Sequence, residues 1–183
     1  MLRPQDILVS LKFLSPTPEA FTSYATLAAS LSLSVSETHA AVKRAIRSGL
    51  LIPSHFRPEN LAECRPSVPA LGELLCYGIR YFFPAELGRV GMGIPTATSA
   101  QPLLRQLTPA DVLHVSPHPR GSARGTTVDP LYSSAPEAAM RDPILAEWLA
   151  LTDALRLHTG RIAELARNEI RNRLREFSYA AAA

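Results

Sequence analysis

The chain has 183 residues, of which 46% are hydrophobic and 19% are charged, and its formal net charge is +3. This balance excludes a disordered polyelectrolyte and fits one medium-sized domain or two small ones. The mild excess of positive charge permits contact with nucleic acid but does not require it.

Two cysteines, Cys64 and Cys76, are too few for a disulfide scaffold, which favours a reducing compartment. The first residues have no apolar signal core, and the chain has no run of 18 apolar residues. We therefore expect a cytoplasmic protein without a membrane partner.

The first predicted helix covers residues 3–14. Pro4 suits the first helical position, because the N–H that it lacks would have no partner there. Leu8, Leu11 and Leu14 recur at helical spacing and predict one buried face. The segment Ser-Pro-Thr-Pro that follows ends the helix.

Residues 22–52 predict two short helices joined by a tight turn, followed by a short strand. The first helix starts at Thr22 or Ser23, whose hydroxyl can accept a backbone N–H. The second helix starts with Ser34 and Glu37, which fit the S-x-x-E capping box. Gly49 suits the left-handed conformation that often ends a helix. The side chains expected to face inward are Leu27, Ala28, Leu31, Thr38, Val42 and Ala45.

This segment resembles the helix-turn-helix of winged-helix transcription regulators of the broad MarR type. Ser32 departs from the pattern, because many such motifs have glycine in this turn. An alternative is an ordinary αα-hairpin packed in an unrelated core. The features that match are Leu27-Ala28, Leu31, Leu33, Ser34, Val42, Lys43-Arg44 and Gly49-Leu50-Leu51.

The resemblance implies a recognition helix that enters the major groove of double-stranded DNA. Its early residues would read base edges, and its later basic residues would contact phosphates. The residues assigned to base edges are Ser36, His39 and Ala40, and those assigned to phosphates are Lys43, Arg44 and Arg47.

The resemblance also implies a wing, formed by a strand at residues 50–52, a tip at 53–60 and a weak return strand at 61–64. His55 and Arg57 would lie at the tip, where wings of this class approach DNA. The alternative for both side chains is a solvated loop.

A further helix is predicted at residues 68–83, with Gly78 inside it. Beyond it, prolines and glycines are dense. Residues 112–115 and 125–128 could form a β-hairpin with a long loop. The glycine-rich residues 88–93 are interpreted as a flexible loop rather than a phosphate loop, because no clear strand precedes them. His114 and His118 are interpreted as surface or packing residues rather than zinc ligands, since prolines exclude a helix there.

The last third predicts two helices. Asp142 and Pro143 form a good N-cap and N1 pair, and Gly160 separates the two helices. The apolar stripes consist of Leu145, Trp148, Leu149, Thr152 and Leu155 in the first helix and of Ile162, Leu165 or Ala166, Ile170, Leu174 and Phe177 in the second.

The expected fold is mainly α with a small β component: an N-terminal winged helix followed by an α+β extension that ends in two helices. We expect a DNA-binding unit at 1–83, an irregular segment with a hairpin at 84–135, and a helical dimerisation or partner-binding region at 136–179.

The expected function is that of a sequence-specific, DNA-binding transcription regulator, more often a repressor, acting as a homodimer through its C-terminal helices. An alternative is an antitoxin-like interaction module whose C-terminal region binds a partner protein. No group of residues predicts catalysis, a cofactor or a metal site.

Overall fold

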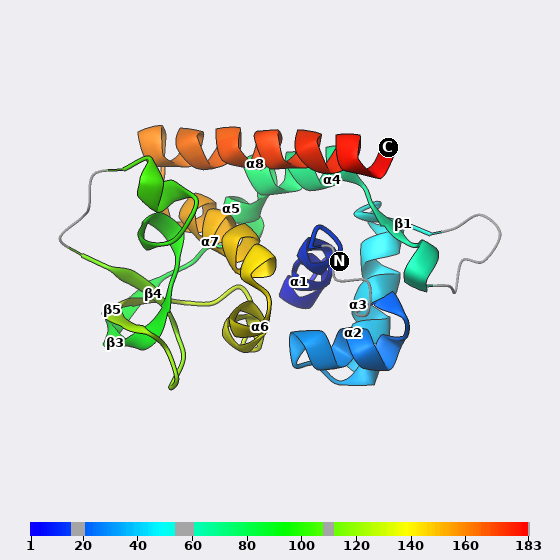
Figure 1. The fold of residues 1–183 in the computed structure, drawn as a ribbon, viewed down its shortest axis with the longest axis horizontal. Helices are drawn as coiled ribbons and strands as arrows, with labels where there is room; N and C mark the ends of the chain where they lie inside the picture. The colour runs from blue at the N-terminus through cyan, green and yellow to red at the C-terminus, as the bar shows by residue number, and fades with distance from the viewer. Residues whose placement is uncertain (16–20, 54–60, 108–111, 183) are drawn as a thin grey trace.

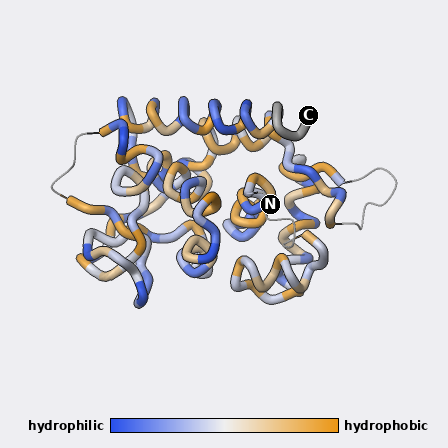
Figure 2. The backbone as a smooth tube through the Cα atoms, viewed as in Figure 1, coloured by the Kyte–Doolittle hydropathy of each residue, from blue (hydrophilic) through white to orange (hydrophobic). Residues whose placement is uncertain are grey.

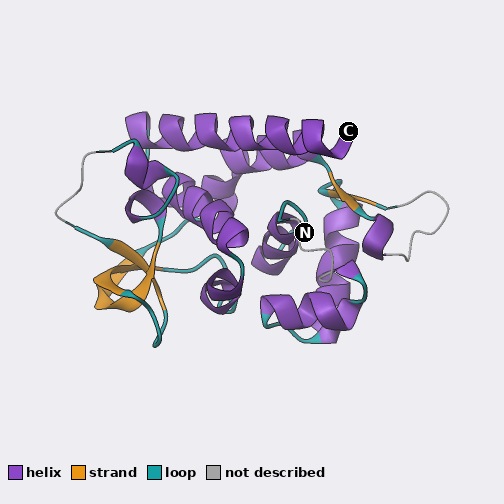
Figure 3. Ribbon diagram, viewed as in Figure 1, coloured by secondary structure: helices purple, strands orange, loops and turns teal. Residues whose placement is uncertain are grey.

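The computed structural model describes residues 1–15, 21–53, 61–107 and 112–182. It is mainly helical, with two small groups of strands at opposite ends of the molecule (Figures 1 and 3). This architecture confirms the expected fold class, mainly α with a small β component.

The N-terminal unit consists of α1 (Pro4–Lys12), α2 (Tyr24–Leu31) and α3 (Val35–Arg47). Helices α1 and α2 both pack against α3. The leucines of α1 and the segment after it are buried, as are the expected inward residues of α2 and α3. The helical periodicity therefore identified the buried faces of all three helices correctly.

The turn between α2 and α3 follows from local chemistry. The Ser34 hydroxyl accepts the N–H of Glu37 at 3.1 Å, and the Glu37 carboxylate accepts the N–H of Ser34 at 3.3 Å. The capping box is thus confirmed. Ser32 adopts the left-handed conformation (φ 52°) that glycine more commonly takes, and Gly49 does the same (φ 75°) after α3.

A short two-stranded sheet follows α3. Strand β1 (Leu51–Ile52) pairs in antiparallel fashion with β2 (Arg65–Pro66). The predicted return strand at residues 61–64 is wrong, because residues 61–63 form the 3-10 turn η2 (Leu61–Glu63). Leu61 and Cys64 pack into the core from this segment, so the strand that pairs with β1 begins only at Arg65. The expected tip, with His55 and Arg57, lies outside the described residues.

The predicted helix at residues 68–83 is one helical run with a local change of winding. Helix α4 (Val68–Glu73) passes through the π-helical turn η3 (Leu74–Gly78) into α5 (Ile79–Phe82). The backbone carbonyl of Cys76 in the π turn accepts a hydrogen bond from Arg167 Nε at 2.9 Å. Helix propensity and periodicity do not distinguish a π-helical turn from an α-helical one, so the sequence analysis missed η3.

Three strands curl into a small closed sheet, formed by β3 (Leu87–Pro95), β4 (His114–Pro117) and β5 (Ala123–Val128). Strand β3 runs antiparallel to both neighbours, and β4 pairs with β5 in parallel. The predicted hairpin of β4 with β5 is therefore wrong. The interpretation of residues 88–93 as a flexible loop is also wrong, since they belong to β3.

Glycines allow the strands of this small sheet to approach one another closely. A Cβ atom at Gly93 would lie 2.3 Å from the Ser116 carbonyl oxygen, and one at Gly125 would lie 2.3 Å from the Leu113 carbonyl oxygen. Both distances are far below van der Waals contact. The glycine-rich segment thus allows the backbones to approach closely.

Two short 3-10 turns, η4 (Ala97–Ser99) and η5 (Leu103–Arg105), follow β3 and precede β4 in the chain.

The C-terminal part contains α6 (Ala135–Arg141), which was not predicted, then α7 (Pro143–Leu157) and α8 (Gly160–Ala182). Asp142 caps α7 as expected, because its Oδ1 accepts the N–H groups of Ile144 and Leu145 at 3.0 Å. Helix α8 lies across α7 and α4 (Figure 1). Figure 2 shows hydrophilic and hydrophobic residues alternating along α8, as an amphipathic helix requires.

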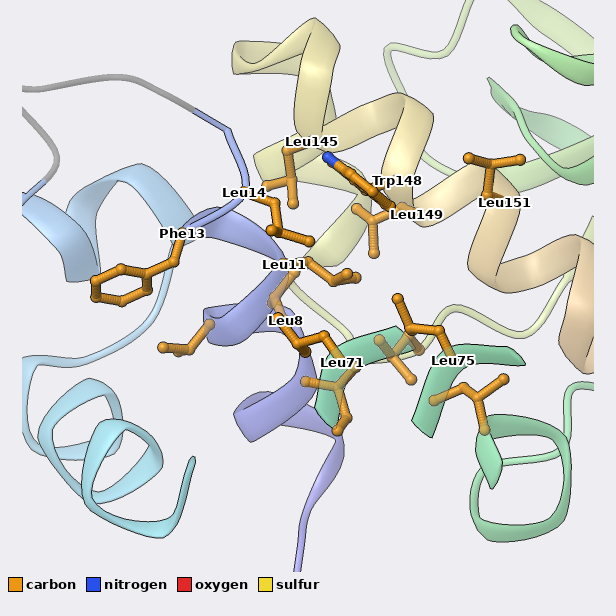
Figure 4. Packing of buried hydrophobic residues seen from close by; sticks show 14 of the residues in the cluster. Leu8, Leu11, Phe13, Leu14, Leu71, Leu75, Leu145, Trp148, Leu149 and Leu151 are labelled. Atoms are coloured by element: carbon orange, nitrogen blue, oxygen red, sulfur yellow. The ribbon is translucent and has the colours of Figure 1, made fainter. Parts of the chain in front are cut away.

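One hydrophobic cluster connects all three regions expected from the sequence. In Figure 4, Leu11 and Leu14 of the N-terminal unit lie toward Leu145, Trp148 and Leu149 of α7, and Leu8 lies beside Leu71 of α4. A buried ion pair joins the same elements, with Lys12 Nζ 2.6 Å from Asp142 Oδ2. The N-terminal three-helix unit and the C-terminal helices consequently share one core.

Candidate nucleic-acid interface

Helix α3 separates an inward face from an outward face. Thr38, Ala41, Val42 and Ala45 are buried against α1 and α2. The opposite face carries four of the predicted DNA-contacting residues in exposed positions and one, Ala40, in a half-buried position. The exposed four are Ser36, His39, Lys43 and Arg47. Their spacing of three or four residues aligns them along one side of the helix.

Arg44 was expected beside them, and the structure assigns its side chain to a different task. Its Nη2 lies 2.7 Å from Asp6 Oδ1, and its Nε lies 3.0 Å from both carboxylate oxygens. Asp6 is fully buried. Arg44 therefore neutralises a buried charge on α1 and positions α3, and its contact with the DNA backbone stays a prediction. Arg57, also predicted to contact DNA, lies outside the described residues.

Glu37 is the one acidic residue in α3, and its carboxylate is engaged. Besides Ser34, it accepts a hydrogen bond from the hydroxyl of Tyr132 at 2.9 Å. The hydrogen bonds from Ser34 and then Tyr132 hold the pKa of Glu37 below its usual value. The carboxylate is therefore directed toward the C-terminal region and away from the exposed cations of α3.

His39 is held by an aromatic neighbour. Its ring lies edge-on to the ring of Tyr24 on α2, with centroids 4.9 Å apart. Such an arrangement restricts the rotation of the imidazole while leaving its edge exposed. The ring of His39 is thus oriented before any ligand arrives.

Arg65 on β2 adds an exposed cation to the two-stranded sheet, and the sequence analysis did not single it out. Its Nη1 donates to the carbonyl oxygens of Ala62 at 2.8 Å and Cys64 at 3.1 Å. Strand β1, its pairing partner, contacts α3. A single arginine in a two-residue strand has no periodic pattern around it that would mark it as a DNA-contacting residue.

A cluster of charged side chains joins α6 to the other elements. Glu137 contacts His118 at 2.8 Å, Arg120 at 3.0 Å and Arg141 at 2.7 Å. These partners, His118 first, lower the pKa of Glu137 to about 2. Arg141 also donates to the carbonyl oxygen of Ala29 at 2.8 Å, near the end of α2. Helix α6 thereby fastens the helix-turn-helix to the C-terminal region.

The apolar faces expected to form a dimer interface are occupied within the chain. Helices α7 and α8 pack against each other, and α8 also packs against α4. Five of the six residues predicted to meet a second copy have exposed fractions of 6% or less, and the sixth, Phe177, is half-buried. The five are Trp148, Leu149, Leu155, Ile170 and Leu174. Amphipathic periodicity identifies a buried face but does not say which partner covers it.

Two histidines meet at the opposite side of the core. The ring centroids of His114 on β4 and His158 at the end of α7 lie 5.5 Å apart. Burial lowers the pKa of both, and the pKa of His158 is lowered further by His114 and Arg80. Nε2 of His158 is buried and has no hydrogen-bond partner among the described residues.

We expect this pair to make the protein acid-sensitive. Because the folded chain favours the neutral imidazoles, the unfolded chain binds protons first as the pH falls. The stabilising contribution is fully present above the ordinary histidine pKa of 6.5 and is lost as the pH falls through the lower folded-state values. Urea unfolding at several pH values between 7.5 and 5.5 measures this loss, which should shrink in His158→Gln and persist in His39→Gln. An equal loss in both variants would contradict the assignment.

Comparisons with protein-family models, curated proteins and solved structures find no match to this chain. Within the described residues, every helix is too short or too polar to span a bilayer. In the same part of the chain, no three histidine, cysteine or acidic side chains gather as a metal site would require.

Proposed function

We propose that the protein binds double-stranded DNA through the outward face of α3, with the strands β1 and β2 as a small wing, and that it acts as a transcription regulator. The observation that carries the proposal is the combination of a three-helix unit with an exposed, uniformly non-acidic helix face. Along that face polar residues precede cations, which is the order of a recognition helix.

In this proposal, Lys43 and Arg47 contact phosphates, and Ser36, His39 and Ala40 approach base edges. Arg44 acts indirectly, because its pairing with Asp6 fixes the rotation of α3 about its axis. Arg65 extends the phosphate contacts from the wing. Repression would follow if the bound site overlaps a promoter.

The proposal is tested by binding to a random pool of duplex DNA at several salt concentrations. We expect the double variant Lys43→Gln/Arg47→Gln to bind about tenfold more weakly or worse at low salt. The slope of log affinity against log salt should also fall by about two, one for each lost phosphate contact.

The matched control is Arg89→Gln/Arg105→Gln, which removes the same net charge from exposed positions outside the winged-helix unit. It should retain the wild-type affinity and salt slope. The assignment of the α3 face would be wrong if the two double variants weakened binding equally, since net charge alone would then explain the effect.

We also propose that the chain acts on DNA as a homodimer, because one small winged helix contacts few base pairs and a second copy adds to the binding free energy. The interface must use surfaces other than the apolar faces of α7 and α8, which are buried within the chain. Light scattering on the full chain, alone and with DNA, measures this. A monomer in both samples at tens of micromolar would contradict it.

A second candidate, an antitoxin-like module that binds a partner protein, is favoured by the outer face of β3. Leu87, Val90 and Met92 are 56%, 61% and 49% exposed there, which is unusual for large apolar side chains in one strand. Substituting all three with serine should leave DNA binding intact under the first proposal. Loss of a co-purifying partner without loss of DNA binding would support the second.

A further inference from the structure

A small pocket lies where η3 and α5 face α7 and α8. It has a volume of about 80 Å³. Leu75 and Leu155 contribute apolar walls, Tyr77 and Tyr81 contribute aromatic walls, and two arginines, Arg80 and Arg167, also line it. Among the described residues that line it, none is acidic. The pocket therefore combines two cations with no carboxylate in its wall.

Both arginines have structural bonds that leave donors unused. Nη1 of Arg80 donates to the carbonyl oxygen of His158 at 2.8 Å. Arg167 donates through Nε to the carbonyl oxygen of Cys76 and through Nη1 to Glu164 at 3.2 Å. A guanidinium has five N–H donors in a planar fork, so each side chain retains further donors. These remaining N–H groups are not needed for the bonds that Arg167 makes to the π turn and Arg80 makes to the end of α7.

The local charge is not balanced. The carboxylate of Glu164 is shared between Arg167 at 3.2 Å and Arg171 at 3.5 Å. Arg171 itself donates to the hydroxyl of Tyr77, a wall of the pocket. Arg80 also acts on a neighbour of the pocket: after burial and His114, the charge of Arg80 lowers the pKa of His158.

We propose that this pocket binds a small oxyanion of the phosphate class between Arg80 and Arg167. Arginine matches such anions well, because its planar fork can donate two parallel charge-assisted hydrogen bonds. The volume suits a single tetrahedral group. It is far smaller than the several hundred Å³ typical of sites for larger ligands such as nucleotides.

The bound anion also changes the protonation of the neighbouring histidine. The groups that face His158 are His114 from β4 and Arg80 from α5. A negative charge beside Arg80 offsets its repulsion of the imidazolium and therefore raises the pKa of His158. By linkage, the affinity for the anion increases as the pH falls.

The test is a titration of the full chain with inorganic phosphate at constant ionic strength, followed by the NMR signal of the His158 ring and by calorimetry. We expect saturable binding and a raised pKa of His158, neither of which chloride reproduces. Arg80→Gln and Arg167→Gln should each weaken binding about tenfold or more. Arg105→Gln, which removes an exposed charge elsewhere, should leave the affinity unchanged.

The wild-type titration decides the proposal even if a variant folds poorly. No saturation by phosphate, or a His158 response that chloride matches, would overturn it. Folded Arg80→Gln and Arg167→Gln proteins that bind phosphate as tightly as wild type would overturn it as well, because the anion would then occupy another place.

Discussion

Val42→Asp is expected to destabilise the protein by about 4 kcal/mol or more, a large part of the free energy of unfolding of a typical domain. Val42 is 1% exposed at the centre of the contact between α3, α1 and α2. Of the two cations next along the helix, Lys43 is exposed to solvent and Arg44 is already bound to Asp6. An aspartate at this position would therefore bury a charge without a partner, and urea unfolding followed by circular dichroism measures the cost.

Lys43→Asp is the matched control, because it places the same side chain one residue further along the same helix. Lys43 is exposed, so the aspartate remains in water. This variant should lie within about 1 kcal/mol of wild type. Similar unfolding curves for the two variants would mean that α3 is rotated relative to the arrangement described above.

The second large effect is expected for Arg156→Met, which should lower the free energy of unfolding by about 3–5 kcal/mol. Its side chain is 2% exposed and lies 2.7 Å from the carboxylate of Asp153. It also donates to the carbonyl oxygens of Phe83 at 2.7 Å and Asp129 at 2.9 Å. One guanidinium thus joins α7 to the segment after α5 and to the segment after β5.

Removing it leaves several buried groups unsatisfied at once. Asp153 retains the hydroxyl of Thr96 as a donor at 2.7 Å. Burial already raises the pKa of Asp153 against the opposing effect of Arg156, so the pKa of this carboxyl should rise further in the variant. Thermal unfolding of Arg156→Met and of Arg161→Met, an exposed position on α8, separates this effect from the loss of any arginine. Equal melting temperatures for the two variants would contradict the structural role of Arg156.

The pair of helices α2 and α3 with its connecting turn could be predicted because its signals are local. Capping at Ser34 and Asp142, the glycine stop at Gly49 and the leucine spacing of α1 each depend on residues within one or two turns. Such interactions form in the same way whatever the rest of the chain does. The same holds for the buried faces of α7 and α8.

The remaining features depend on contacts between residues far apart in sequence. The glycines of β3 resemble a loop until β4 and β5 close around them. Arg44 carries the sequence signature of a DNA contact, and only the position of Asp6, 38 residues away, shows that it is engaged. The apolar face of α8 likewise acquires its partners α4 and α7 only in the folded chain.

The most direct test of the central claim is to locate the DNA on the protein. Amide hydrogen exchange of the full chain is measured with and without a duplex selected from the random pool. DNA binding through α3 predicts slower exchange in the amides of α3 and of the paired strands β1 and β2, with little change in β3, β4 and β5. Protection confined to the three-stranded sheet or to α8, with α3 unchanged, would contradict the proposed interface.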